Sequence, residues 1–262
     1  VRKGTVVLDD TAPTVDISSD KASLSIGQTA EVTFTFTENP GQTFDAGDIA
    51  VTGGSLGEVS GAGLTRTATF TPTAGLDDST ATFALSQTND YQDAAGNEGL
   101  LGTNVVSIDF DTLAPTIDAI DIASATGLVD GYANAGDVVT VTVDFSETVT
   151  VTGTPELALQ VGTSVVQAQY VSGSDAQDGV LTFSYTVEAG LLDDDGISIN
   201  PDALSLSGGA IVDAFNNAAD LDSAAVGADA GFKVDSVLAT IETSSFTVNE
   251  NTRAIGELSA DE

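Results

Sequence analysis

An acidic phrase of seven residues occurs three times along the chain. It reads Asp-Asp-Thr-Ala-Pro-Thr-Val at 9–15 and Asp-Thr-Leu-Ala-Pro-Thr-Ile at 111–117, and a weaker copy, Asp-Ser-Val-Leu-Ala-Thr-Ile, occupies 235–241. A phrase that returns after 102 and then 124 residues is typical of domains in tandem. The phrase, called the joint below, therefore divides the 262 residues into a first repeat (1–110), a second repeat (111–235) and the start of a third module (236–262).

The hydrophobic pattern between the joints is that of β-strands. Apolar residues alternate with threonine, serine or aspartate in 31–37, 139–145 and 181–187, so each segment has one face for a core and one for water. No segment shows a long helical stripe, and Gly, Asn and Asp clusters separate the strands. The sequence therefore predicts an all-β protein of antiparallel sandwiches arranged end to end. Further strands are expected at 49–52, 67–70, 80–85, 105–110, 157–161, 166–171 and 197–199.

The first two repeats share landmarks in the same order. Phe-Thr-Glu at 36–38 corresponds to Phe-Ser-Glu at 145–147, and Asp-Ala-Ala-Gly-Asn at 93–97 corresponds to Asp-Ala-Phe-Asn-Asn at 213–217. Such order is expected if the second repeat has the same topology with small loop insertions.

Composition narrows the classes of partner. The chain has 40 acidic and 6 basic residues, a formal net charge of −34, and no His, Cys, Met or Trp. Nucleic acids and anionic membranes require clustered Lys and Arg, so neither is expected as a ligand, and zinc sites built from His or Cys are excluded. The sequence contains no apolar run of about 18 residues, so it predicts no membrane span. Residues 1–4 lack the apolar stretch of a signal peptide, and we expect the chain to be a piece of a longer protein. Cations are the natural partners.

The acidic and amide residues that recur at the landmarks are the candidate metal ligands. Strand ends and loops at one pole of a sandwich converge, and carboxylate and amide oxygens are the ligands that Ca²⁺ takes at six- to eight-fold coordination. The alternative is that Asp and Asn simply form turns and that a Glu at a strand end is solvated. The predicted calcium ligands are Asp9, Glu38, Asp93, Asn97, Asp109, Asp111, Glu147, Asp213, Asn217, Asp235 and Glu250.

Catalysis has little support in the sequence. Without His or Cys a general base would be a carboxylate or Lys, and no serine lies in a nucleophile-elbow context. Hydrolysis of glycosides by paired carboxylates needs a deep cleft that is usually lined with aromatic residues, and only 6% of the residues are aromatic. We therefore expect no enzymatic activity.

The joint, the strand ending in Phe-(Thr/Ser)-Glu and the Asp-Ala-Ala-Gly-Asn loop together resemble the bacterial Ig-like repeats of large surface adhesins exported by type I secretion, which include biofilm-associated and RTX adhesins. The resemblance covers roughly residues 9–235. Residues 248–252 with Asp261 are similar to the opening of a cadherin-like repeat, in which the glutamate, here Glu250, helps to hold calcium. The third joint departs from the pattern, since Leu238-Ala239 replaces Ala-Pro.

This resemblance implies a calcium-stiffened stalk on the bacterial cell surface that projects a distal adhesive domain. Its partners would be calcium ions and neighbouring repeats of the same polypeptide, and the chain would be monomeric. Two alternatives stay open. A module that binds glycans or a host surface directly would need an exposed aromatic platform, whereas acidity that serves only solubility in salt would respond to sodium and calcium alike.

Overall fold

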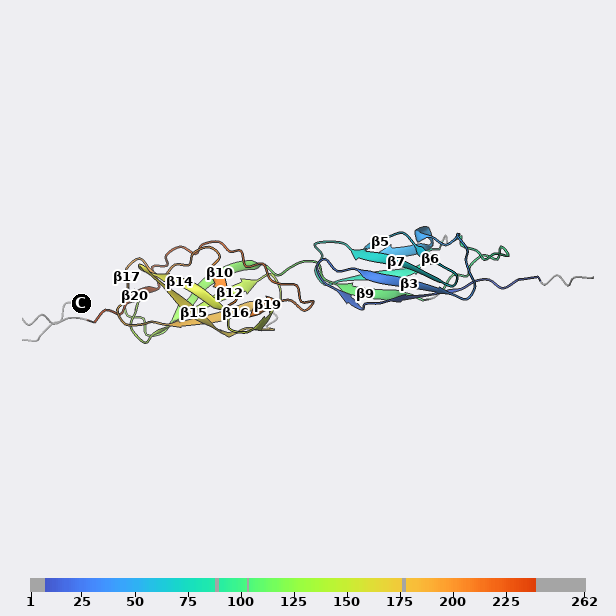
Figure 1. Ribbon diagram of the computed structural model, residues 1–262. Helices are drawn as coiled ribbons and strands as arrows, with labels where there is room; N and C mark the ends of the chain where they lie inside the picture. The colour runs from blue at the N-terminus through green and yellow to red at the C-terminus, as the bar shows by residue number, and fades with distance from the viewer. Residues whose placement is uncertain (1–7, 88–89, 103, 176–177, 239–262) are drawn as a thin grey trace, which may run out of the picture. The chain divides into compact units, whose positions relative to one another are not determined.

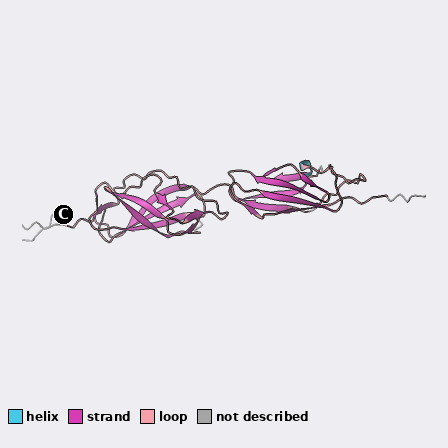
Figure 2. Ribbon diagram, viewed as in Figure 1, coloured by secondary structure: helices cyan, strands magenta, loops and turns pink. Residues whose placement is uncertain are grey.

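The structure, a computed structural model, describes residues 8–87, 90–102, 104–175 and 178–238. Strands account for nearly all of its regular structure, and a single turn of 3-10 helix, η1 (Ala46–Asp48), interrupts them among these residues (Figure 2). The prediction of an all-β protein with antiparallel sheets is confirmed. No helix within the described ranges is long and apolar enough to cross a membrane.

The chain forms two compact units (Figure 1). Unit 1 comprises Val1–Pro115 together with Val212–Ala219, and unit 2 comprises Thr116–Ile211 together with Asp220–Glu262. The repeat boundaries drawn from the sequence stay predictions.

Unit 1 contains two sheets. The first has the order β1-β3-β7-β5, with β6 also paired to β7, and its strands are β1 (Val15–Ser19), β3 (Ala30–Phe36), β5 (Gly54–Leu56), β6 (Ser60–Ala62) and β7 (Thr65–Pro72). The second has the order β2-β9-β8-β4, and its strands are β2 (Ser23–Leu24), β4 (Ile49–Thr52), β8 (Ser79–Leu85) and β9 (Val106–Phe110). All of these pairs are antiparallel except β2 with β9.

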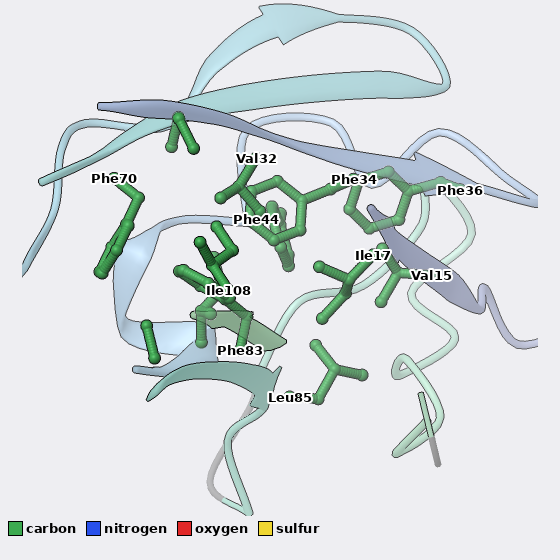
Figure 3. Close-up of a cluster of buried hydrophobic side chains, with 14 of the residues drawn as sticks. Val15, Ile17, Val32, Phe34, Phe36, Phe44, Phe70, Phe83, Leu85 and Ile108 are labelled. Atoms are coloured by element: carbon green, nitrogen blue, oxygen red, sulfur yellow. The ribbon is translucent and has the colours of Figure 1, made fainter. Parts of the chain in front are cut away.

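The alternating residues of the two sheets meet in one core (Figure 3). Val32, Phe34 and Phe36 project from β3 on one side, and Phe83 and Ile108 project from the other sheet. The rings of Phe70 and Phe83 lie 4.8 Å apart, edge to face, which joins β7 to β8 across the sandwich. Burying these side chains is what holds a unit without disulfides together.

Unit 2 contains a six-stranded sheet and two small ones. The large sheet has the order β10-β12-β16-β15-β14-β18, with β10 (Ile117–Ala125), β12 (Val138–Phe145), β14 (Glu156–Val161), β15 (Ser164–Ser172), β16 (Val180–Thr186) and β18 (Leu204–Ser205). The small sheets are formed by β11 (Tyr132–Ala133), β20 (Lys233–Asp235) and β17 (Leu192–Asp193), and by β13 (Thr150–Thr152) and β19 (Ala210–Val212).

Two pairing patterns occur in both units. The antiparallel run β1-β3-β7 corresponds to β10-β12-β16, and the short parallel pair of β2 with β9 corresponds to that of β11 with β20. In each unit the strand that follows the joint lies at the edge of an antiparallel run, and the last strand of the repeat pairs in parallel with a short strand.

Most expected strands are present. Residues 31–37, 139–145 and 181–187 fall largely within β3, β12 and β16, and the expected strand at 49–52 is β4. The strand expected at 197–199 is wrong. Ile197 and Ile199 are buried, but Ser198 bridges to Gln160 while Ile199 bridges to Val226, so consecutive residues pair with different partners and no ladder forms.

We predict that Phe83→Ala lowers the free energy of unfolding of unit 1 by about 3–5 kcal/mol, because it leaves a cavity against Phe70 in a fully buried position. Urea titration followed by circular dichroism measures this loss. Thr69→Ala, on the exposed face of β7, is the control and should stay within about 0.5 kcal/mol of the parent. Equal effects of the two changes would contradict the described core.

Candidate metal centre

Three of the predicted ligands come together in unit 1. Asp9 lies in the joint before β1, Glu38 follows the end of β3, and Asp93 lies in a loop between β8 and β9. Each offers a carboxylate oxygen, and these oxygens all lie within 4.8 Å of one another. Asp93 is buried, Glu38 is half-buried and Asp9 is exposed. The group is therefore open to solvent on the side of the joint.

The loop Asp93–Asn97, called the Asp93 loop, fixes the most buried carboxylate. One oxygen of Asp93 accepts hydrogen bonds from the backbone N–H groups of Ala95 (2.8 Å) and Asn97 (2.9 Å), and the other accepts from the Asn97 side-chain Nδ2 (2.8 Å). Gly96 has φ of +89°, a left-handed conformation that glycine adopts without strain. The hydrogen bond from the Asn97 side chain, aided by the backbone donors, lowers the pKa of Asp93 against the opposing effect of burial.

The joint is tied to the same loop through its backbone. Asn97 Nδ2 donates to the backbone oxygen of Asp9 (3.3 Å), and Asp9 Oδ1 accepts from the Thr11 N–H (3.2 Å). The hydroxyl of the buried Tyr91 donates to the backbone oxygen of Pro13 (3.3 Å). Burial and, to a lesser degree, the charge of Asp48 raise the pKa of Tyr91 to about 12, so this hydroxyl keeps its proton at neutral pH.

Glu38 is held from both sides of its position in the chain. Before it, Thr37 N–H donates to the Thr14 backbone oxygen (3.0 Å), so the strand end is paired with the joint. After it, the buried guanidinium of Arg66 donates to the backbone oxygen of Gly41 (2.6 Å) and to Asn39 Oδ1 (3.4 Å). The Arg66 side chain also bonds two further backbone oxygens, so it fastens the turn that follows Glu38.

The three carboxylates repel one another. Partial burial raises the pKa of Glu38, and the negative charge of Asp9, a hydrogen bond to Asp93 and the charge of Asp93 raise it further. Carboxylates that repel one another are stabilised when one of them binds a proton or when they share a cation. Oxygen atoms of this kind are the ligands that Ca²⁺ prefers. The side-chain nitrogen of Asn97, not its oxygen, faces Asp93.

A second group of predicted ligands also lies in unit 1. Asp111, Asp213 and Asn217 are 1%, 3% and 3% exposed. The loop Asp213–Asn217, called the Asp213 loop, repeats the bonds of the Asp93 loop: Asp213 accepts from the N–H groups of Phe215 and Asn217 (both 2.8 Å) and from Asn217 Nδ2 (2.7 Å). Asn217 Nδ2 also donates to the backbone oxygen of Asp111 (3.2 Å), as Asn97 does to Asp9.

Two carboxylates near Asp111 were not among the predicted ligands. Asp77 and Asp78 form the turn before β8, and an oxygen of Asp77 lies within 4.8 Å of one of Asp111. Burial raises the pKa of Asp111 most, with the charges of Asp213, Asp77 and Asp78 adding to it, while a hydrogen bond from the Leu113 N–H opposes the rise. The sequence signal that could have found them is the acidic pair at the end of Ala-Gly-Leu-Asp-Asp (74–78), directly before β8.

Four further predicted ligands complete the set. Asp109 is exposed on β9 and accepts from Thr80 Oγ1 (2.9 Å). Asp235 ends β20 and accepts from the Val237 N–H (3.1 Å). Glu147 follows β12 in unit 2 and is half-buried. Glu250 lies outside the described residues, and the metal-binding role of every residue in the set stays a prediction.

Comparisons with known proteins bear on the fold of unit 1. Residues 9–110 match the family model of the bacterial Ig-like domain. Among solved structures the chain is similar to the adhesin FdeC of Escherichia coli, with 12% identity over 88% of this chain and 66% of that one and a TM-score of 0.38. It is also similar to the adhesin InvE of Yersinia pseudotuberculosis, with 19% identity over 70% of this chain and 53% of that one and a TM-score of 0.29. The chain thus spans less than two thirds of either structure, and no curated protein matches it.

The family match confirms the predicted Ig-like identity for 9–110. Export by type I secretion and kinship with RTX adhesins stay predictions. The cadherin-like stretch at 248–252 lies outside the described residues.

We predict that Glu38→Gln raises the melting temperature at neutral pH in the presence of a chelator. The raised pKa of Glu38 means that its charged form destabilises the folded state, so this destabilisation disappears as the pH is lowered through that pKa. The advantage of the variant should therefore fade at acidic pH. The lowered pKa of Asp93 acts in the opposite sense, since its contribution is lost as the pH falls, but both proteins share it.

Differential scanning calorimetry across pH measures this difference. Glu31→Gln, which removes the same charge from the exposed face of β3, is the matched control. A Glu38→Gln variant that melts below the parent in chelator, or in step with Glu31→Gln at every pH, would contradict the repulsive group.

Proposed function

We propose that this chain is a calcium-stiffened stalk segment of a bacterial surface adhesin, located outside the cell. One observation carries the proposal: the carboxylates of Asp9, Glu38 and Asp93 converge where the joint meets a bacterial Ig-like domain. The sequence resemblance to adhesin repeats supports the same function. A stalk of this kind acts by geometry rather than by chemistry, so it needs no catalytic group.

The carboxylate group suits calcium better than magnesium. Mg²⁺ demands near-ideal octahedral geometry and gives up its water reluctantly, whereas Ca²⁺ accepts six to eight oxygens at flexible angles. Asp9, Glu38 and Asp93 come from three separate segments, and one of them is exposed, which favours the more tolerant ion. In this proposal water completes the coordination.

Calcium at this position would restrain the joint. Asp9 belongs to the joint, whereas Glu38 and Asp93 belong to the body of the domain, so one ion would fasten the joint to the domain surface. It would also offset charge in a chain whose formal net charge is −34 and which otherwise repels itself.

The same residue types recur at the later joints. Asp111, Glu147 and Asp213 follow Asp9, Glu38 and Asp93 in the same order, and Asp235 begins the third joint. We infer that the later joints bind calcium with equivalent residues. Neighbouring repeats of the same polypeptide would then be the protein partners, and the chain would stay monomeric.

The alternative of direct glycan binding lacks its expected platform in the described part of the chain. Tyr91 and Tyr185 are buried, and Tyr170 and Tyr132 are partly covered, the first against Phe183 and the second beneath Lys233. The stalk is therefore the function we put forward.

Calcium should raise the stability of the folded chain. If free calcium exceeds the dissociation constant about 100-fold, each independent site adds about 2.7 kcal/mol, and extracellular modules commonly bind at about 10⁻⁴–10⁻³ M. We expect Asp9→Asn and Glu38→Gln each to lose the increment of one site, and Glu31→Gln to keep it. Calorimetry in millimolar calcium, in chelator, and in sodium chloride of matched ionic strength measures these increments.

Melting that is unchanged by chelator would count against calcium binding. An equal response to sodium and calcium would instead support acidity that serves only solubility.

Small-angle X-ray scattering tests the stiffening itself. We predict that removal of calcium from the full chain broadens the distribution of interatomic distances, and that Glu38→Gln in calcium shifts the profile part of the way towards that of the parent in chelator. Profiles that superimpose with and without the ion would contradict the stalk mechanism even if calcium binds.

A further inference from the structure

Unit 1 contains two loops of the same construction, and they differ in one respect. The Asp93 loop and the Asp213 loop share the bonds to the leading aspartate. Each is closed by an isolated bridge between its flanking residues, Gln92 with Glu98 in one and Val212 with Ala218 in the other. The two side-chain amides, Asn97 and Asn217, are therefore oriented alike, with Nδ2 towards the aspartate and Oδ1 away from it.

A turn elsewhere in unit 1 is hydrogen-bonded to the Asp213 loop. The residues Ser25–Gln28, called the Ser25 turn, follow β2 and close through a bond from the Gln28 N–H to the Ser25 backbone oxygen (3.1 Å), with φ of +73° at Gly27. The Ser25 hydroxyl donates to the backbone oxygen of Phe215 (2.7 Å), and the Ile26 N–H donates to Asn217 Oδ1 (2.7 Å). Asn217 is 3% exposed.

The Asp93 loop presents the same two acceptors without a donor. The equivalents of the Phe215 oxygen and of Asn217 Oδ1 are the Ala95 oxygen and Asn97 Oδ1, and neither accepts a hydrogen bond from any residue in the described ranges. Ala95 is exposed and Asn97 is half-buried. A rigid, preformed pair of acceptors is thus available at the pole of unit 1 that carries Asp9.

We propose that the Asp93 loop is a docking surface for a turn of the Ser25 kind on another Ig-like module. The partner is defined by its chemistry: a tight turn with glycine at its third position, a backbone N–H at its second position and a hydrogen-bond donor side chain at its first. Among the described residues, a further turn of this form is Asn134–Asp137, closed by a bond from the Asp137 N–H to the Asn134 oxygen (3.0 Å), with Gly136 at φ of +94°. Each module would then carry a donor turn and an acceptor loop.

This inference rests on the tandem arrangement in the proposed function, but not on calcium. The contact of the Ser25 turn with the Asp213 loop consists of direct hydrogen bonds between protein atoms. Docking and metal binding can therefore fail separately.

The test supplies the missing turn. A second copy of residues 9–110 is placed directly before Asp9 of the full chain, so that the copied Ser25 turn precedes the Asp93 loop by a joint of natural length. The chain has no cysteine, so a pair can be introduced without background: Gln28→Cys in the leading copy and Glu98→Cys in the following one. The positive control in the parent chain pairs Gln28→Cys with Ala218→Cys, two positions that line one hollow beside the observed contact.

We expect mild oxidation to close the disulfide of the tandem chain at least about tenfold faster than that of a control with Leu76→Cys in place of Gln28→Cys. Leu76 is exposed and bonds Thr112 of the second joint, so both cysteines lie at the same pole and are tethered alike, but only one is docked. Ser25→Ala or Ile26→Pro in the leading copy should slow the reaction about three- to tenfold, as expected for the loss of one hydrogen bond. The rate should be the same in calcium and in chelator.

Cross-linking no faster than the Leu76→Cys control, with the positive control intact, would overturn the proposal. Cross-linking that requires calcium would also overturn it, because the metal rather than the loop would then hold the modules. Loss of the calcium-dependent increment in stability with unchanged cross-linking would overturn the calcium proposal and leave this one standing.

Discussion

Repulsion among carboxylates is the constraint around which the pole of unit 1 is built. The carboxylates of Asp9, Glu38 and Asp93 lie within 4.8 Å of one another although like charges repel, so other contacts must hold them in place. Asp93 is held by backbone N–H groups and the Asn97 amide. Glu38 is positioned through its neighbours in the chain: Thr37 pairs with Thr14 before it, and the guanidinium of Arg66 binds the turn after it. The unfavourable charge energy is therefore stored in a rigid site, where a cation can release it.

The core supplies the rigidity that this site needs. Side chains from β3, β7, β8 and β9 fill the space between two sheets, and the aromatic contacts of Phe36, Phe44 and Tyr91 lie in the same core cluster. Tyr91 belongs to both systems, since its ring packs in the core and its hydroxyl bonds the Pro13 oxygen of the joint. A change deep in the core can therefore reach the joint through one side chain.

The Asp93 and Asp213 loops show how a single short sequence can perform two tasks. The aspartate closes the loop by accepting three hydrogen bonds. The side-chain nitrogen of the asparagine donates both to this aspartate and to the backbone of the joint. The amide oxygen faces outwards, and in the Asp213 loop it accepts a hydrogen bond from the Ile26 N–H. Restraint of the joint and recognition of a neighbouring turn thus depend on opposite ends of the same amide group.

The sequence by itself determined most strands and the recurrence of the landmarks, because the alternation of apolar and polar residues and the repeated phrase are local features of the chain. It also brought Asp9, Glu38 and Asp93 into one hypothesis, since all three precede or follow predicted strands. Tertiary structure alone decided the rest. The two isoleucines at 197 and 199 take separate partners, Asp77 and Asp78 add their charge to Asp111, and Asn217 meets Ile26 across 191 positions of sequence. Each of these depends on which distant segments become neighbours after the sheets pack, and no local pattern encodes that choice.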